Sequence, residues 1–420
     1  MQASSARRAG ALFTLALGGF GIGTTEFATM GILPLAADEL VPVFATDPAT
    51  GIAHAGWMIT AYALGVVVGA PLVAMWGARM PQRDLVLVLL VAFVVANAAS
   101  GLMPTLELTL LARFLAAVPH GAYFGVASLL AARIMGPGRQ GAGIALALSG
   151  LTVANVIGVP AGTWLGQVAG WRWTYVAVAA IFLVTLVLAW LLLPRYPGDP
   201  SRSARSELAA FRSGRLWLMI AVACVGFGGF FAVYSYAAEL VTREAGLPES
   251  AIAWLLAAIG VGMTIGNVVG GWASDRSNRV TIVVGFSGFI VVLVLLGLLG
   301  AHPVALFVLA SLLGAAGSLL VPTIQARIIG IARDAALLGA AANHAAFNVG
   351  NALGAAVGGA VIAAGLGYLA PAWVGVGLAC AGFALALLSL RLDRGVDTAS
   401  HPVVGTPLGP TTAGIEVIER

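Results

Sequence analysis

The segment NVIGVPAG at residues 155–162 is matched by NALGAAVG at residues 351–358, so the pattern NxxGxxxG occurs twice, 196 residues apart. A second set repeats at a shift of 197: Trp57, Gly65, Gly69 and Arg79 correspond to Trp254, Gly262, Gly266 and Arg276. Gly-Phe-Gly at 19–21 also recurs at 226–228, where a longer first loop explains the larger shift of 207. Three sets in the same order indicate a tandem repeat of one structural unit.

The composition places this repeat in a membrane. Of 420 residues, 60 % are hydrophobic and 9 % are charged, and the mean hydropathy is +0.99. A soluble domain carries about a quarter charged residues, so water is not the main solvent of this chain. Apolar runs of about 20 residues cross the hydrocarbon core as helices, because a helix satisfies its own backbone groups there. The first run, 11–33, is too long for a secretory signal and is interpreted as a retained span.

Twelve apolar runs are separated by charged or Pro/Gly breaks. They predict an all-α membrane protein with twelve transmembrane helices in two pseudo-symmetric six-helix bundles. The predicted spans are 11–33, 54–76, 84–103, 107–132, 141–166, 173–193, 216–238, 251–273, 280–300, 303–329, 337–363 and 368–390. The predicted domains are an N-terminal bundle at 1–194, a cytoplasmic linker rich in Pro, Ser and Arg at 195–215, a C-terminal bundle at 216–392 and a flexible cytoplasmic tail at 393–420.

The arginines predict the orientation. The chain has 21 basic residues, all arginine, and placing both termini inside puts 18 of them on the cytoplasmic side and 2 on the outer side. This asymmetry follows the positive-inside rule and fits an even number of spans. We therefore expect a multi-pass protein of the bacterial cytoplasmic membrane with both termini cytoplasmic. Because each chain contains both halves of its own cavity, we expect a monomer.

Glu26 is the only acid predicted in mid-span. A carboxylate there is costly, and burial disfavours its charged form, which suits a group that must gain and lose a proton. A structural carboxyl bonded to neighbouring threonines is the alternative. Arg113 is the only arginine deep in a span; it either modulates a nearby carboxylate or forms a fixed structural pair. His120 and His344 also lie within spans, as titrating groups or as packing residues.

Two further groups of residues are candidates for gating and packing. The sequence GWASDRSNR at 271–279 joins the eighth and ninth spans, and its Asp/Arg pair could latch one helix end against its neighbour. The predicted cytoplasmic gate consists of Gly271, Asp275, Arg276, Arg279, Arg79 and Arg83. Close helix packing, with or without a functional kink, is expected at Gly158, Pro160, Gly162, Gly354 and Gly358.

A cavity between the halves would need aromatic faces and amide groups with little charge. The candidates are Tyr62, Tyr234, Tyr236, Asn343, Phe347 and Asn348, although each one could equally be a packing residue. Such a lining suits a small, neutral, moderately apolar solute.

Several classes of protein are not supported. The sequence has no GxxxxGK[ST] phosphate loop, no HExxH and no Cys/His cluster, so neither an enzyme nor an ATP-driven pump is indicated, and no cofactor or metal is expected. Cys224 and Cys380 lie far apart in apolar runs and are interpreted as small core residues. The sequence has no basic patch interleaved with aromatic residues, so a nucleic-acid partner is not expected. The expected partners are a small-molecule substrate, protons and the lipid bilayer.

Several motifs together resemble the major facilitator superfamily. They are GTTEF at 23–27, GILP at 31–34, YALG at 62–65, the Asp275-Arg276 loop and NHAAFNVGN at 343–351. The chain is similar to the twelve-span drug/proton antiporters, in the arabinose-efflux-permease-like and chloramphenicol-exporter-like branch. The resemblance implies alternating access, a proton-coupling acid at Glu26 and a proton-relay arginine at Arg113. Two positions depart from the family pattern: Ala78 replaces the acid of the loop motif, and the fifth-span motif reads Gly-Val-Pro-Ala-Gly.

Three functions fit these observations. The leading hypothesis is proton-driven efflux of a small neutral compound, such as an amphenicol-like drug or a sugar, with multidrug resistance as a possible physiological role. Proton-coupled uptake or facilitated diffusion of a sugar-like metabolite is the second. A membrane receptor or scaffold without transport is the third, and it gives no reason for an acid at Glu26.

Overall fold

A computed structural model describes residues 5–77, 80–136, 140–196, 213–332 and 336–392. In these ranges the chain is helical with no strand, and eleven helices are long and apolar enough to cross a membrane. One of them, α13 (Ser250–Leu299), contains Ser277, whose φ of −160° and ψ of 95° leave the helical region. The predicted eighth and ninth spans meet at this residue, so α13 supplies two of the twelve predicted crossings.

The N-terminal half is built from α1 to α9. Its elements are α1 (Ser5–Leu40), η1 (Pro42–Ala45), α2 (Pro48–Ala55), α3 (Trp57–Gly77), α4 (Gln82–Leu102), α5 (Leu106–Ala117), α6 (His120–Met135), α7 (Gln140–Val153), η2 (Ala154–Gly158), α8 (Val159–Ala169) and α9 (Trp171–Leu192). The helix α1 extends beyond the predicted first span at both ends and continues through Pro34. Proline is tolerated inside membrane helices because neighbouring groups satisfy the freed backbone carbonyl.

The C-terminal half repeats this design. Besides α13, its elements are α11 (Gly214–Tyr234), α12 (Ala237–Glu239), η4 (Leu240–Glu244), α14 (Pro303–Ala332), α15 (Ala336–Ala363) and α16 (Ala370–Leu392). The seventh crossing runs to Glu244, beyond its predicted end at 238. This length brings a second buried acid into a crossing, because Glu239 lies near its end and is 2 % exposed. The carboxylate of Glu239 lies 3.7 Å from Nε of Arg243.

The repeated glycines have the same structural role in both halves. A Cβ added to Gly65 would lie 2.2 Å from the backbone oxygen of Phe114, so α3 packs directly against the backbone of α5. In the C-terminal half a Cβ on Gly262 would lie 2.0 Å from the backbone oxygen of Ser311, where α13 packs against α14. Small residues allow this close approach of membrane helices.

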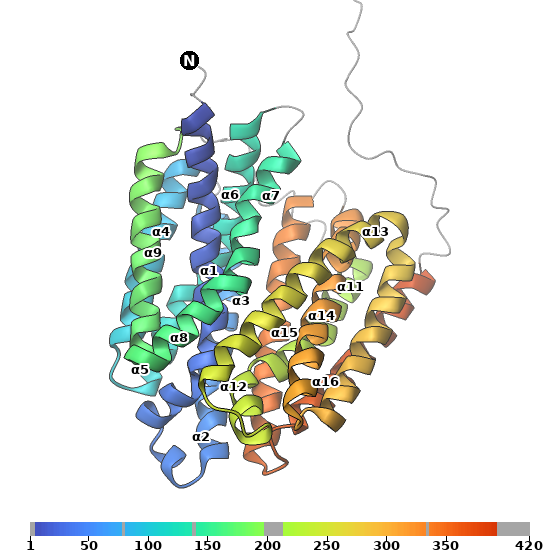
Figure 1. The fold of residues 1–420 in the computed structure, drawn as a ribbon. Coiled ribbons are helices and arrows are strands. Elements are labelled where there is room, and N and C mark those ends of the chain that lie inside the picture. The colour runs from blue at the N-terminus through green and yellow to red at the C-terminus, as the bar shows by residue number, and fades with distance from the viewer. Residues whose placement is uncertain (1–4, 78–79, 137–139, 197–212, 333–335, 393–420) are drawn as a thin grey trace, which may run out of the picture.

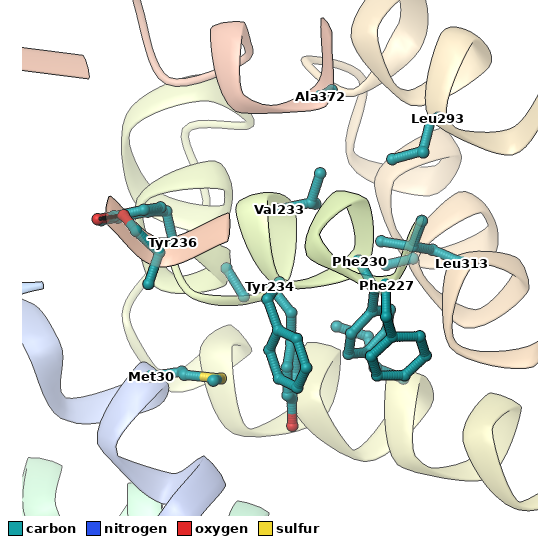
Figure 2. Packing of buried hydrophobic residues seen from close by; sticks show 14 of the residues in the cluster. Met30, Phe227, Phe230, Val233, Tyr234, Tyr236, Leu293, Leu313 and Ala372 are labelled. Carbon is teal, nitrogen blue, oxygen red and sulfur yellow. Dashed lines mark hydrogen bonds between the residues drawn. The ribbon is translucent and has the colours of Figure 1, made fainter. Parts of the chain in front are cut away.

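The two halves stand side by side and meet mainly at one end of the molecule (Figure 1). The "α2 end" is the end that carries α2 and α12; the "Ser5 end" is the opposite one, where α1 begins. One buried cluster joins the halves towards the α2 end, and in it Met30 of α1 lies with Phe227, Phe230 and Tyr234 of α11 (Figure 2). Towards the Ser5 end, α6 and α7 stand apart from the tops of α13 to α15 (Figure 1). The molecule is therefore closed at the α2 end.

Candidate functional site

A cavity lies between the halves, and both halves supply its walls. The N-terminal half contributes Glu26, Phe27, His120, Leu151, Thr152 and Asn155. The C-terminal half contributes Phe227, Phe231, Met263, Thr264, Asn267, Ser318, Val321, Gln325, Asn343, His344, Phe347 and Asn348. Glu26 is the only acidic side chain among them, so the lining combines aromatic rings and amides with one carboxyl group.

Glu26 sits where the two halves meet. It is 6 % exposed, and Nδ2 of Asn351, on α15 of the other half, donates to its Oε1 at 3.5 Å. Its Oε2 lies 4.0 Å from Nδ1 of His120. One carboxyl group therefore faces the cavity and contacts a polar side chain from each half.

Arg113 lies behind the cavity wall and is fully buried. Its guanidinium donates to the hydroxyl of Thr25 at 2.8 Å and to the backbone oxygen of Thr25 at 2.9 Å. The rings of Tyr62 and Tyr175 flank it, with centroids 4.4 and 4.9 Å from Cζ. No ion pair joins Arg113 to Glu26 in the described part of the chain, so its link to the acid runs through the adjacent residue, Thr25.

The residues that hold this arginine were not predicted from the sequence. The hydroxyl of Thr25 also donates to Oδ1 of Asn97, on α4, and Nδ2 of Asn97 donates to the backbone oxygen of Phe93. The only available signal was an amide in the middle of the third span. Thr25 and Asn97 thus belong to the polar network beside Glu26, although neither was among the candidates.

The two histidines both reach the cavity. Nδ1 of His120 lies 3.2 Å from the hydroxyl of Tyr62, and the His120 ring meets that of Phe124 edge to face at 5.3 Å. The ring of His344, from the other half, stacks on the same Phe124 ring, with centroids 5.7 Å apart. Phe124 therefore contacts two histidines that come from different halves.

Three of the six predicted cavity residues line the cavity: Asn343, Phe347 and Asn348. The three tyrosines lie elsewhere. Tyr62 belongs to the arginine site, and Tyr234 is buried against Phe27 at 5.8 Å between ring centroids. The hydroxyl of Tyr236 donates to the backbone oxygen of Ala355 at 2.6 Å, inside the contact between the halves. None of these tyrosines is among the residues that line the cavity.

The predicted gate residues are only partly assembled. Asp275 is exposed and forms no ion pair with a described residue. Cζ of Arg276 lies 3.6 Å from the ring centroid of Trp272. A Cβ added to Gly271 would meet no atom within 4 Å, and Arg279 is exposed. Arg83 is buried and donates to the backbone oxygen of Trp190. Arg79 lies outside the described residues.

Asn278 makes the helix contact that was expected of Asp275. Its Nδ2 donates to the backbone oxygen of Thr323 on α14 at 2.8 Å and to Oγ of Ser274 at 3.0 Å. In this conformation the segment at 271–279 is therefore joined to α14 by a hydrogen bond from the Asn278 amide.

The NxxGxxxG glycines let the spans that carry them approach α1 and α11. A Cβ on Gly158 would lie 2.2 Å from Oγ1 of Thr24, and one on Gly354 would lie 2.3 Å from the backbone oxygen of Gly228. Contacts at Gly162 and Gly358 are looser, at 3.1 Å from Ala28 and 3.0 Å from Ala232. Pro160 lies in the first turn of α8, which follows the π-helical turn η2.

Comparison with known proteins identifies the family. The Major Facilitator Superfamily model matches residues 15–243 and 227–417. The inner membrane transport protein YdhP of Escherichia coli K12 is 36 % identical over 392 residues, covering 92 % of this chain and 97 % of YdhP. A chloramphenicol resistance protein of Streptomyces lividans is 33 % identical, covering 94 % and 99 %. The putative transporter AraJ of E. coli K12 is also 33 % identical, covering 95 % and 99 %.

Solved structures show the same fold at low sequence identity. A D-xylose–proton symporter has a TM-score of 0.72 with 15 % identity and covers 91 % of this chain and 97 % of its own. An inward-facing, occupied bacterial homologue of the lysosomal transporter Spinster has a TM-score of 0.70 with 17 % identity, covering 93 % and 98 %. With the family model and the three relatives, these likenesses confirm the resemblance found in the motifs: the chain belongs to the Major Facilitator Superfamily of multi-pass membrane transporters.

Proposed function

We propose that this protein exports a small neutral compound from the bacterial cytoplasm in exchange for protons, by alternating access. The observation that carries the proposal is the position of Glu26, a buried carboxyl group on the cavity wall that contacts Asn351 of the opposite half. A buried ionisable group in a membrane is costly and is retained where it serves a proton or ion pathway.

The contact between Glu26 and Asn351 suggests how the proton is coupled to movement of the halves. The ionised carboxylate accepts a hydrogen bond from the Asn351 amide, and a charge-assisted bond of this kind is about twice as strong as a neutral one. Protonation of Glu26 weakens this link between α1 and α15. The proton therefore changes the balance between conformations that hold the halves together and those that separate them.

The substrate class follows from the lining and from the relatives. Aromatic rings and amides surround a single carboxyl group, which favours a neutral solute with an apolar part. The name of the Streptomyces relative records chloramphenicol resistance, and this supports an amphenicol as the first compound to test. We also propose that both termini are cytoplasmic, that the transporter works as a monomer and that a role in drug resistance follows from efflux.

The test uses proteoliposomes with an imposed pH gradient and a panel of labelled solutes that includes chloramphenicol and a pentose. Wild-type protein should accumulate a solute against its gradient and dissipate the pH gradient at the same time. Glu26→Gln keeps the volume but cannot ionise, so uphill movement should collapse while downhill movement survives. Glu107→Gln, at an exposed acid of α5, is the matched control and should behave like wild type.

Two results would refute the proposal. Glu26→Gln protein that accumulates solute as wild type does would move the proton site elsewhere, with His120 and His344 as the next candidates. Accumulation only in the direction of uptake would replace efflux by proton-coupled uptake. For the orientation, a reporter fused after Arg394 that reads out from the outer side would contradict cytoplasmic termini.

A further inference from the structure

Asn343 stands out among the polar side chains of the cavity. It lines the cavity, it is 1 % exposed, and neither its Nδ2 nor its Oδ1 has a hydrogen-bond partner in the described part of the chain. Buried amide groups in native proteins are almost always hydrogen-bonded, since an unpaired one costs free energy. An amide that is buried, unpaired and at a cavity wall is in place to bind a ligand.

Neighbouring amides on the same helix are partly engaged within the protein. Asn348 donates through Nδ2 to the backbone oxygen of His344 at 3.0 Å, and Asn351 donates to Glu26. Their Oδ1 atoms have no partner among the described residues. Asn343, Phe347 and Asn351 follow at every fourth position, so they share one face of α15. Asn343 is the member of this face with both its donor and its acceptor free.

An aromatic surface lies beside this amide face. Phe347 follows Asn343 by one helical turn, and its ring centroid is 4.5 Å from that of Phe227. Phe227 in turn contacts Phe231 at 5.4 Å, and Phe231 stacks on Phe27 at 6.3 Å. Phe227 meets both Phe347 and Phe231 edge to face, so four rings from three helices form a continuous aromatic surface next to the unpaired amide.

The repeat shows that the acid and the unpaired amide each occur in only one half. At the shift of 196 residues, Asn343 corresponds to Ala147 and Asn348 to Thr152. Glu26 corresponds to Val233 at the shift of 207. The acid is therefore specific to the N-terminal half, and the free amide is specific to the C-terminal half.

We propose that Asn343 is the specificity-determining residue of the cavity and binds a cargo that carries a hydrogen-bond donor and acceptor side by side, as in a primary carboxamide, a lactam or a vicinal diol, attached to an aromatic or other flat apolar group. A carboxamide presents one acceptor and two donors in one plane, so it forms two parallel hydrogen bonds with such a pair. The flat group of the cargo lies on the aromatic surface. This inference rests on the proposed function only in taking the cavity as the cargo site.

The test is a binding experiment on purified protein without any gradient, so its outcome does not depend on proton coupling or direction. The probes are 4-butylbenzamide and methyl 4-butylbenzoate, which share the butylphenyl group and the carbonyl group, while only the primary amide has a donor beside its carbonyl oxygen. Isothermal titration calorimetry against a detergent blank gives the ratio of the two dissociation constants. Wild-type protein should bind the amide about 10-fold more tightly, because the ester leaves one atom of Asn343 unpaired.

Variants assign this preference to Asn343. In Asn343→Leu and Asn343→Ala the ratio should fall to about 1, because no amide remains to be satisfied. Thr264→Val is the matched control: Thr264 also lines the cavity, but its hydroxyl already donates to the backbone oxygen of Gly260 at 2.9 Å, so the ratio should stay as in wild type.

A stability measurement separates a ligand-binding amide from a structural one. Replacing an unpaired buried amide by leucine should leave Tm unchanged or raise it, whereas removing a structural amide should lower it. The proposal is overturned by wild-type protein that binds neither probe or does not distinguish them. It is equally overturned by Asn343 variants that keep the wild-type ratio, or by a Thr264→Val protein that loses it.

Discussion

The contact between Gly260 and the π-helical turn η2 offers a direct way to shift the balance between the two access states. A Cβ added to Gly260 of α13 would lie 2.1 Å from the backbone oxygen of Asn155, in the opposite half. Ordinary carbon–oxygen contacts are about 3.3 Å or longer, so Gly260→Ala must push the halves apart by roughly 1 Å at this point. The contact forms where the halves meet, so the substitution destabilises the conformation closed at the α2 end.

The expected magnitude follows from the cost of overpacking. Inserting a methyl group into a well-packed contact costs about 1–3 kcal/mol. If this cost falls on one of two states, the population of the other state rises by about 5-fold to about 150-fold. Gly260→Ala should therefore raise the population of molecules open at the α2 end by a factor in this range.

The assay is labelling of a buried cysteine. Ala37 is fully buried in the cluster that joins the halves, so Ala37→Cys is reached from outside only when the α2 end opens. Cys224 and Cys380 are replaced by alanine, and a membrane-impermeant maleimide is added on the α2 side. While the open state is minor, the labelling rate is proportional to its population and should rise by the same factor.

Two glycines of the same helix provide controls. Gly262→Ala also creates a clash, 2.0 Å from the backbone oxygen of Ser311, but within one half, so it should lower Tm and leave the labelling rate unchanged. Gly288→Ala meets no atom within 4 Å and should change neither. An unchanged labelling rate in Gly260→Ala, or an equal rise in Gly262→Ala, would refute the reasoning that this contact is specific to the closed α2 end.

Three further predictions concern the gate, the arginine site and α2. Asp275→Asn should slow turnover and leave solute affinity within about 2-fold, because an exposed side chain remote from the cavity alters the access states and not the site; a large loss of affinity in a binding titration would contradict this. Arg113→Lys keeps the charge but loses the planar fork that holds Thr25 at two atoms, so solute-coupled proton movement should fall by about 10-fold or more, measured as pH change in proteoliposomes. The hydroxyl and then the amide of Thr50 lower the pKa of Asp47, which caps α2 from a position outside the spans. Because the pKa of Asp47 is lower in the folded state, its ionised carboxylate stabilises the fold fully above the ordinary aspartate pKa of about 3.9, and this stabilisation is lost as the pH falls through the lowered value. In Asp47→Ala protein, Tm should therefore fall less steeply below about pH 4 than in wild type. Equal acid sensitivity of the two proteins would contradict this prediction.

The sequence predicted the spans and halves well because membrane helices are determined by composition. It did not predict which face of each helix packs against other helices and which face is turned to the lipid. Trp57 and Gly65 both repeat in the C-terminal half and look equally informative, yet Trp57 is 50 % exposed while Gly65 touches the backbone of α5. Apolar residues cover both the lipid-facing and the core-facing sides, so the pattern that separates them in soluble helices is absent.

Cavity-lining residues could be picked out from the sequence where their chemistry is rare in a membrane span, and not where it is common. A carboxylate in a span is costly enough to identify Glu26 without a structure. Tyr234 and Tyr236 could not be separated from cavity residues, because a tyrosine suits both a cavity wall and a packed interface. Glu239, which is not among the cavity residues, was not placed in a span because the seventh crossing continues past its predicted end.

The differences between the repeats bear more directly on mechanism than their similarities. The glycines that match, such as Gly65 and Gly262, perform the same packing in each half and account for the shared fold. Where the repeats differ, one half carries Glu26 and the other carries Asn343, and their two helices meet in the contact between Glu26 and Asn351. Under the proposed function, in which Glu26 carries the proton and Asn343 binds the cargo, the two halves must move together, since the bond that joins them changes strength when the proton leaves.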